Sequence, residues 1–255
     1  MTRQIDKQCL PVGSGYETLF GKNRLALAIT QTQAAKISEG SDIERKMMEV
    51  ADQPLSLANL DELECLVAGF LPESDKCYAI SKADIKKYLW PYLLAPHVEN
   101  WDELSKKERA ALCQKHFVHD PDLAFVDTKA RTITFVELKT YCVFDTEKSQ
   151  AIANKLHDMP LCYNMAYKAR SRVVCFYAKS VDDVIDGMKK KISPRVVMTG
   201  EHLLKQISSV TMKDFIGQHA AVHEENVFFL LQSAITSAQA INPERLRELM
   251  VNLSP

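Results

Sequence analysis

The chain has 255 residues, of which 46% are apolar and 25% are charged, and its 32 Lys and Arg residues nearly balance 33 Asp and Glu residues. This composition is typical of a globular protein and excludes a collagen, a long disordered chain and a coiled-coil rod. The longest apolar runs, such as 227–231, are too short to cross a membrane. The net charge of −1 argues against a strongly basic nucleic-acid coat protein, but not against an enzyme with a local basic surface.

Seven cysteines are scattered along the chain without a CxxC pair, so no zinc clip is expected. Their odd number and apolar surroundings favour reduced thiols in a cytoplasmic protein. The first residues contain no apolar run typical of a signal peptide, which supports the same expectation.

The first 100 residues show mostly helical periodicity. Helices are predicted within 22–50, 55–70 and 82–95, and the Ser41-x-x-Glu44 pattern predicts a capping box that opens a second helix in the first of these segments. A further amphipathic helix is predicted over 101–117.

The pattern then changes to short segments rich in β-branched and aromatic residues. Strands are predicted at 123–126, 132–136 and 173–177, and the last is apolar throughout, as expected for a central strand. The remaining elements are a helical pattern over 146–168 broken near Pro160, short helices at 180–191 and 200–208 around a strand at 195–198, a long helix at 218–240, and a last helix from Pro243. We therefore expect one α/β domain over 1–255, with a helical elaboration over about 1–100, a catalytic core over about 101–200 and C-terminal helices over 201–255.

Charged residues gather at the open end of the predicted hairpin. With Lys129 and Ala130 at its tip, the register places Asp122 opposite Glu137, and the two-residue period of a strand puts Lys139 on the same face as Glu137. Two such close carboxylates repel each other unless a cation lies between them, and oxygen ligands suit Mg²⁺. Since a neighbouring lysine can hold or deprotonate a water molecule, this set favours metal-assisted phosphodiester hydrolysis.

The rival carboxylate Asp127 pairs with Thr132 in this register and points to the opposite face, so we exclude it as a metal ligand. The turn contains neither Gly nor Asn, which disfavours a two-residue primed turn. A four-residue loop would keep the register, whereas a three-residue loop would reverse the faces of one strand.

Pro121-Asp122, followed after fourteen residues by Glu137-Leu138-Lys139, resembles the PD-(D/E)xK signature of the restriction-endonuclease-like nucleases. The resemblance covers about residues 101–180 and implies a restriction-endonuclease-like α/β fold, in which helices flank a central mixed sheet. It also implies that Asp122, Glu137 and the Leu138 carbonyl bind Mg²⁺, for which Mn²⁺ can substitute, and that Lys139 orients or activates the attacking water. Many members add an acidic residue from an earlier helix, for which Glu44 is our first candidate and Glu108 our second.

The segment from Lys168 to Arg195 carries eight basic and three acidic residues, a net charge of +5. Basic side chains position nucleic acids through phosphate contacts. The residues expected to bind DNA in this way are Lys168, Arg170, Arg172, Lys189, Lys190, Lys191 and Arg195.

Together these patterns predict a Mg²⁺-dependent endonuclease for double-stranded DNA, most like a type II restriction enzyme. A palindromic target would favour a homodimer. Three alternatives stay open. One is a structure-directed or repair nuclease of the same superfamily, and another is a catalytically inactive DNA-binding or interaction module on the same scaffold. The third is a metabolic α/β enzyme in which the clustered charges are incidental.

Overall fold

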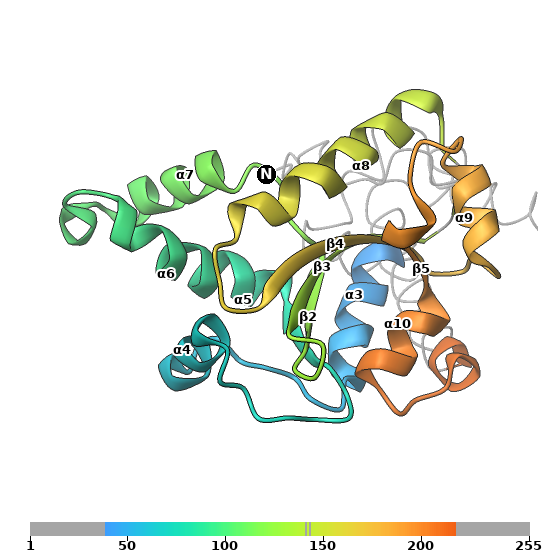
Figure 1. Cartoon of the computed structure of the whole chain (residues 1–255), viewed down its shortest axis with the longest axis horizontal. Coiled ribbons are helices and arrows are strands. Elements are labelled where there is room, and N and C mark those ends of the chain that lie inside the picture. Colours follow the sequence, from blue (N-terminus) through green and yellow to red (C-terminus); the bar gives the residue numbers. More distant parts are fainter. Residues whose placement is uncertain (1–38, 141, 143, 218–255) are drawn as a thin grey trace, which may run out of the picture. The chain divides into compact units, whose positions relative to one another are not determined.

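The computed structural model describes residues 39–140, 142 and 144–217, so the helices predicted at 218–240 and from Pro243 lie outside the described residues. The chain divides into two compact units, and the larger, Glu44–Phe215, holds the whole sheet. This unit is α/β, with a five-stranded mixed sheet flanked by helices (Figure 1). In the part of the chain that the structure describes, no helix is long and apolar enough to cross a membrane.

The five strands follow one another in space in the same order as in the chain. Strands β1, β2 and β3 form an antiparallel meander, and β4 and β5 continue the sheet parallel to β3. Their bounds are β1 Tyr78–Ser81, β2 Leu123–Asp127, β3 Thr132–Lys139, β4 Lys168–Cys175 and β5 Val197–Thr199. The interior position predicted for the apolar 173–177 segment is confirmed, although this strand begins at Lys168 and ends at Cys175.

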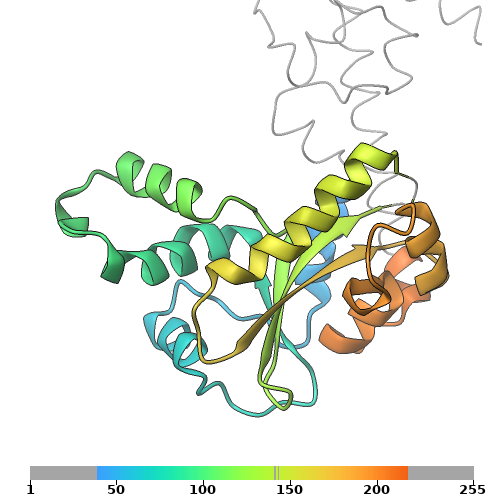
Figure 2. The same ribbon diagram turned by 45° about the horizontal axis from the view of Figure 1, so that its top comes forward.

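Helices cover the sheet. The α-helices are α3 (Glu39–Val50), α4 (Leu60–Ala68), α5 (Lys82–Asp84), α6 (Trp90–Leu94), α7 (Lys106–His116), α8 (Thr146–Asp158), α9 (Val181–Gly187) and α10 (Gly200–Ile207). A π-helix, η3 (Ile85–Leu89), joins α5 to α6, and short 3₁₀ helices are η4 (Ala95–His97), η5 (Trp101–Glu103), η6 (Met159–Cys162) and η7 (Pro194–Val196). Helices α8 and α10 lie on opposite sides of the sheet (Figures 1 and 2).

Three helix predictions are wrong in part. Helix α3 begins at Glu39, so Ser41 is inside the helix and does not open a capping box. The segment 101–117 is divided, because Ser105 caps α7 through reciprocal hydrogen bonds with Glu108. The pattern over 146–168 ends as an α-helix at Asp158, where Pro160 cannot donate a backbone hydrogen bond.

Strand β1 was not predicted, and it lies between the helices expected at 55–70 and 82–95, within the N-terminal part expected to be a helical elaboration. It is only four residues long, and a helix follows it immediately, so it offers neither a long alternation nor a flanking turn signal. Its register with β2 pairs Ser81 with Leu123, so β1 ends where β2 begins. This pairing brings the start of α5 to the same end of the sheet as Asp122.

The predicted hairpin register is confirmed. Val126 pairs with Ile133 and Asp127 pairs with Thr132, as the expected spacing requires. The loop is the four-residue alternative, over residues 128–131, and Arg131 adopts a left-handed conformation with φ 50°. Asp127 stabilises the turn, since its Oδ1 accepts the Ala130 backbone N–H at 2.8 Å.

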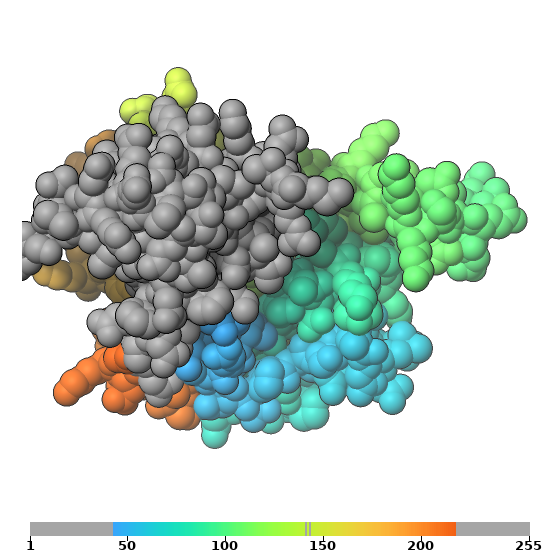
Figure 3. Space-filling model, turned by 180° about the vertical axis from the view of Figure 1, so that it is seen from behind, coloured from blue at the N-terminus to red at the C-terminus, as the bar shows by residue number. Residues whose placement is uncertain are grey.

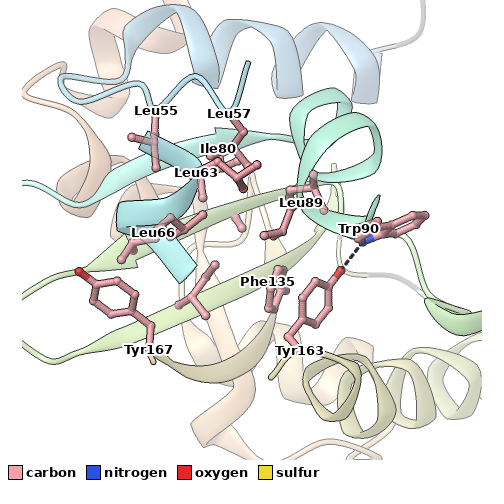
Figure 4. Close-up of a cluster of buried hydrophobic side chains, with 14 of the residues drawn as sticks. Leu55, Leu57, Leu63, Leu66, Ile80, Leu89, Trp90, Phe135, Tyr163 and Tyr167 are labelled. Carbon is pink, nitrogen blue, oxygen red and sulfur yellow. Dashed lines mark hydrogen bonds between the residues drawn. The ribbon is translucent and has the colours of Figure 1, made fainter. Parts of the chain in front are cut away.

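A large apolar cluster covers one of the two buried faces of the hairpin. Ile133 and Phe135 of β3 are fully buried in it, together with side chains from α4 and from the η3–α6 segment (Figure 4). The Tyr163 ring stacks on Phe135 at 3.8 Å between centroids, and its hydroxyl accepts the Trp90 indole N–H at 2.8 Å. Because strand side chains alternate, Glu137 continues the same face as Ile133 and Phe135.

Helices α6 and α7 lie side by side, with the rings of Trp90 and Phe117 stacked 5.1 Å apart. They extend to one side of the sheet (Figures 1 and 2) and form part of the green region at the edge of the space-filling view (Figure 3). The contact between these rings joins α7 to the large apolar cluster.

A second apolar cluster joins α8 and α9 to β4 and β5, with Leu156, Val173 and Val184 among its buried members. The end of α9 packs closely on the segment after β3, and a Cβ atom on Gly187 would lie 1.5 Å from the Cys142 carbonyl oxygen. Any side chain at position 187 would therefore separate α9 from this segment.

We expect Gly187→Ala to lower the free energy of unfolding by about 2 kcal/mol or more, because overpacking of this kind moves the backbone. Urea unfolding followed by circular dichroism measures the change. Gly217→Ala is the matched control, since among the described residues a Cβ there would meet nothing within 4 Å. Equal urea midpoints for the two variants would show that the close contact between Gly187 and the Cys142 carbonyl does not limit stability.

Candidate active site

Asp122 is held at the open end of the hairpin by three hydrogen bonds. Its backbone N–H donates to the Val136 carbonyl at 2.8 Å, and its Oδ2 accepts the Leu138 N–H at 2.7 Å. Its Oδ1 accepts the Lys82 ammonium at 3.2 Å. Continuing the register beyond the Leu123–Val136 pair places Asp122 opposite Glu137, as predicted.

Glu137 is a buried carboxylate that contacts two lysines. Its side chain is 7% exposed, and Oε1 lies 2.5 Å from the Lys139 ammonium, so Lys139 is on the predicted face. Oε2 forms an ion pair with Lys155 of α8. Burial favours the neutral acid, but the hydrogen bonds from Lys139 and Lys155 outweigh it and hold the pKa of Glu137 below its ordinary value.

Glu44 joins this group from α3. Burial is the largest cause that raises its pKa, to about 7, and the negative charges of Asp122 and Glu137 raise it further, while Lys82 and Lys139 oppose them. These mutual effects show that the Glu44 carboxyl lies within electrostatic range of the other two. The structure thus brings the first candidate for the earlier-helix acid to the hairpin end.

The second candidate, Glu108, lies elsewhere. Its carboxylate accepts the Ser105 backbone N–H at 2.8 Å and serves as part of the cap of α7. It is fully exposed, and its pKa is lowered by this local hydrogen bonding. Asp127 is occupied in the turn at the far end of the hairpin, which agrees with its exclusion as a ligand.

Two lysines that contact the carboxylates were missed in the sequence. Lys82 follows β1 and reaches Asp122, and it could not be placed because β1 was not predicted. The position of Lys155 near the sheet could have been predicted, because it is adjacent to Leu156 and three residues after Ile152, which both lie on the buried stripe of α8. Near this end, Lys86 of η3 pairs with Asp120 at 2.6 Å.

The basic residues of the 168–195 segment divide between the two faces of the sheet. Arg170 and Arg172 pair with Thr134 and Val136 across β3–β4, so they point to the sheet face opposite Glu137, as does Lys168 by the same alternation. Arg172 is half-buried and donates to the Arg195 carbonyl at 2.7 Å, which holds the connection before β5. The exposed Lys189, Lys190 and Lys191 follow α9, on the side of the sheet that α8 covers.

The oxygen atoms at the hairpin end are of the type that binds a hard divalent cation such as Mg²⁺. Three carboxylates are present, and the Leu138 carbonyl points to the β2 side because the N–H of the same residue bonds Asp122 there. Among the residues that the structure describes, no three Asp, Glu, His or Cys side chains form a preassembled metal site. Ammonium groups contact the carboxylate oxygens instead, so a metal would have to displace at least one of them.

The raised pKa of Glu44 predicts a pH-dependent stability. Its folded value of about 7 exceeds the ordinary value of 4.5, so its contribution to stability is complete below pH 4.5 and is lost as the pH rises through 7. Relative to the wild type, Glu44→Gln should therefore gain about 1–3 kcal/mol between pH 5 and pH 8.5 without metal. Thermal unfolding across this range tests the prediction, and the exposed Glu49→Gln on the same helix is the control. If the stabilities of the wild type and Glu44→Gln changed equally with pH, the raised pKa of Glu44 in the folded protein would be contradicted.

Comparison of the chain with known proteins gives no relative from which a function could be transferred. No protein-family model matches it, and neither a curated protein nor a solved structure is significantly similar to it. A proposal for the function therefore rests on the geometry of the hairpin end.

Proposed function

We propose that the chain is a metal-dependent nuclease that hydrolyses phosphodiester bonds of double-stranded DNA. The observation that carries this proposal is the convergence of Asp122, Glu137 and Lys139 at the open end of the β2–β3 hairpin, joined by Glu44 from α3. Carboxylates confined together beside a lysine are costly for stability alone, and metal-assisted hydrolysis gives them a chemical role.

The order of elements supports the proposal. A helix carrying an acid precedes an antiparallel meander, and α8 then connects β3 to the parallel strand β4. This arrangement is compatible with the restriction-endonuclease-like core that the PD-(D/E)xK signature implies. Asp122 and Glu137-Leu138-Lys139 occupy the ends of neighbouring strands, as that signature requires.

Each residue then has a defined role. Glu44, Asp122, Glu137 and the Leu138 carbonyl would hold Mg²⁺ or Mn²⁺, which when bound would supply Lewis-acid stabilisation of the phosphate and a water ligand of lowered pKa. Lys139 orients the attacking water and stabilises the negative charge that develops on the phosphate. The backbone N–H of Leu138 fixes the orientation of Asp122.

A site-specific type II endonuclease is the form of nuclease that we propose, acting as a homodimer on a palindromic target. The exposed Lys189, Lys190 and Lys191 are the basic residues best placed to contact phosphates on the α8 side of the sheet, and Lys168 and Arg170 are exposed on the other face. A structure-directed nuclease would use the same chemistry on branched DNA.

One observation favours a second candidate, an inactive DNA-binding or interaction module on the same scaffold. Lysine ammonium groups contact oxygens of both Asp122 and Glu137, and such ion pairs could replace a metal permanently. This module would bind DNA equally well with and without divalent ions.

The decisive experiment is incubation of the purified chain with a sequenced plasmid or phage genome and Mg²⁺, followed by mapping of discrete fragments. We expect cleavage with Mg²⁺ or Mn²⁺, none with EDTA, and DNA binding without cleavage in Ca²⁺, which accepts oxygen ligands but orders them loosely. A four-way junction tested in parallel separates the structure-directed nuclease from the site-specific one. Binding without cleavage under all conditions would favour the inactive module, and full activity in EDTA would refute the metal mechanism.

A further inference from the structure

The carboxylate of Glu137 holds one more ammonium group than its charge requires. Lys139 contacts Oε1, and Lys155 contacts Oε2 from the neighbouring helix α8. Their side chains are 33% and 21% exposed, respectively, so both ammonium groups are partly removed from water. A single lysine neutralises a single carboxylate, and the second lysine adds positive charge at a desolvation cost.

The local charge balance shows what a metal would change. The carboxylates of Glu44, Asp122 and Glu137 supply at most three negative charges, and Lys82, Lys139 and Lys155 supply three positive charges. A divalent cation on Glu137 needs at least one of its oxygens and repels both ammonium groups. The site then carries an excess of about two positive charges, and phosphate groups of a nucleic acid can balance it.

The proposed nuclease mechanism assigns a role to Lys139 but none to Lys155. Lys139 is two residues from Glu137 on the same strand, whereas Lys155 reaches the carboxylate from α8. The sheet-facing side chains of α8, including Ile152 and Leu156, are buried, so the helix backbone keeps its position while the long lysine side chain turns. If the Lys155 ammonium leaves Glu137 Oε2, it therefore remains close enough to contact a group bound beside Glu137.

We propose that Lys155 is a second cationic residue of the site, which exchanges Glu137 for a phosphate oxygen of the DNA when Glu137 takes up the metal. This inference rests on the proposed nuclease function and adds a substrate contact from α8 to it. It also gives the ion pair seen here a role, because the pair keeps Lys155 beside the metal ligand until substrate and metal arrive.

The test measures DNA affinity in Ca²⁺, where binding occurs without cleavage, as a function of salt concentration. One lost phosphate contact reduces the slope of log affinity against log salt by about 0.9. Lys155→Met should show this reduction and bind about 5–10-fold more weakly near 0.1 M salt. Lys155→Arg should keep the wild-type slope. Lys148→Met, which removes an exposed lysine from the same helix, is the matched control and should also keep it.

A second measurement needs no variant. Acetylation of the wild-type protein, mapped by mass spectrometry, should modify Lys155 faster in Ca²⁺ than in EDTA, because the ammonium group leaves Glu137. Added DNA should then protect it. If Lys155→Met keeps the wild-type slope and Lys155 is equally reactive with and without DNA, its role is confined to the ion pair and the inference is overturned. Wild-type protein that neither binds nor cuts DNA would instead refute the proposed function itself.

Discussion

Replacement of Lys139 by alanine is expected to lower the rate of DNA cleavage by about 10²–10³-fold or more. The Lys139 ammonium lies 2.5 Å from Glu137 Oε1, at the end of the strand pair where the scissile phosphate would bind. In the proposed mechanism, its loss removes the group that positions the attacking water and a positive charge that stabilises the transition state. Single-turnover cleavage of a mapped fragment at saturating Mg²⁺ measures this effect directly.

DNA affinity separates this chemical effect from a binding effect. In Ca²⁺, Lys139→Ala should bind DNA nearly as well as the wild type, because it loses at most one phosphate contact among several. A large fall in affinity that accounts for the whole loss of cleavage would assign Lys139 to binding.

Asp127→Asn is the internal control for the register. Asp127 lies in the same hairpin, but it pairs with Thr132 and its Oδ1 accepts the Ala130 N–H, which an asparagine oxygen can also accept. This variant should therefore cleave at close to the wild-type rate. If Asp127→Asn were inactive while Lys139→Ala cleaved normally, the assignment of Asp122, Glu137 and Lys139 would be wrong.

The hairpin could be predicted because its sequence specifies a single register. Both faces of β2 and β3 are buried, and a slip by one residue would turn Glu137 and Lys139 to the opposite face of the sheet, away from Lys155. The turn type was not specified by the sequence. Four loop residues replace the primed turn, and Arg131 adopts the left-handed conformation that glycine usually takes. Asp127 compensates by accepting a backbone hydrogen bond in the turn.

The lysines around the carboxylates depend on tertiary contacts that short sequence patterns do not encode. Lys82 reaches Asp122 only because β1, a strand of four residues, pairs with β2. Lys155 reaches Glu137 only because α8 crosses the sheet face on which Glu137 lies. The periodicity of α8 placed Lys155 beside the buried stripe of that helix, but local periodicity does not say which partner on another element a side chain meets.

Sequence proximity was misleading for the basic segment. Arg170 and Arg172 lie on β4, the strand that pairs with the strand of Glu137 and Lys139, yet the pairing of β4 with β3 directs them to the face opposite Glu137. Arg172 is in addition engaged with the Arg195 carbonyl. A net charge counted along a strand therefore sums two faces, and only alternate residues can act on the same ligand.

Glu137→Gln is expected to abolish cleavage, with a loss of about 10³-fold, and to destabilise the protein at the same time. The amide keeps the shape of the side chain but removes a charged metal ligand. It also leaves the partly buried ammonium groups of Lys139 and Lys155 without their anion. Since both lysines keep some contact with water, we expect the free energy of unfolding to fall by about 1–3 kcal/mol.

A double-mutant cycle separates these two effects. Adding Lys155→Met to Glu137→Gln removes one unpaired ammonium group, so the double variant should be more stable than Glu137→Gln alone, with a coupling energy of about 1 kcal/mol or more. Cleavage should stay absent, because the metal ligand is still missing. Urea unfolding measures the coupling, and Glu147→Gln, an exposed carboxylate on α8, is the control for a simple change in net charge. Additive stabilities would show that Lys155 and Glu137 do not interact in solution, and recovery of cleavage in the double variant would remove Glu137 from the proposed metal ligands.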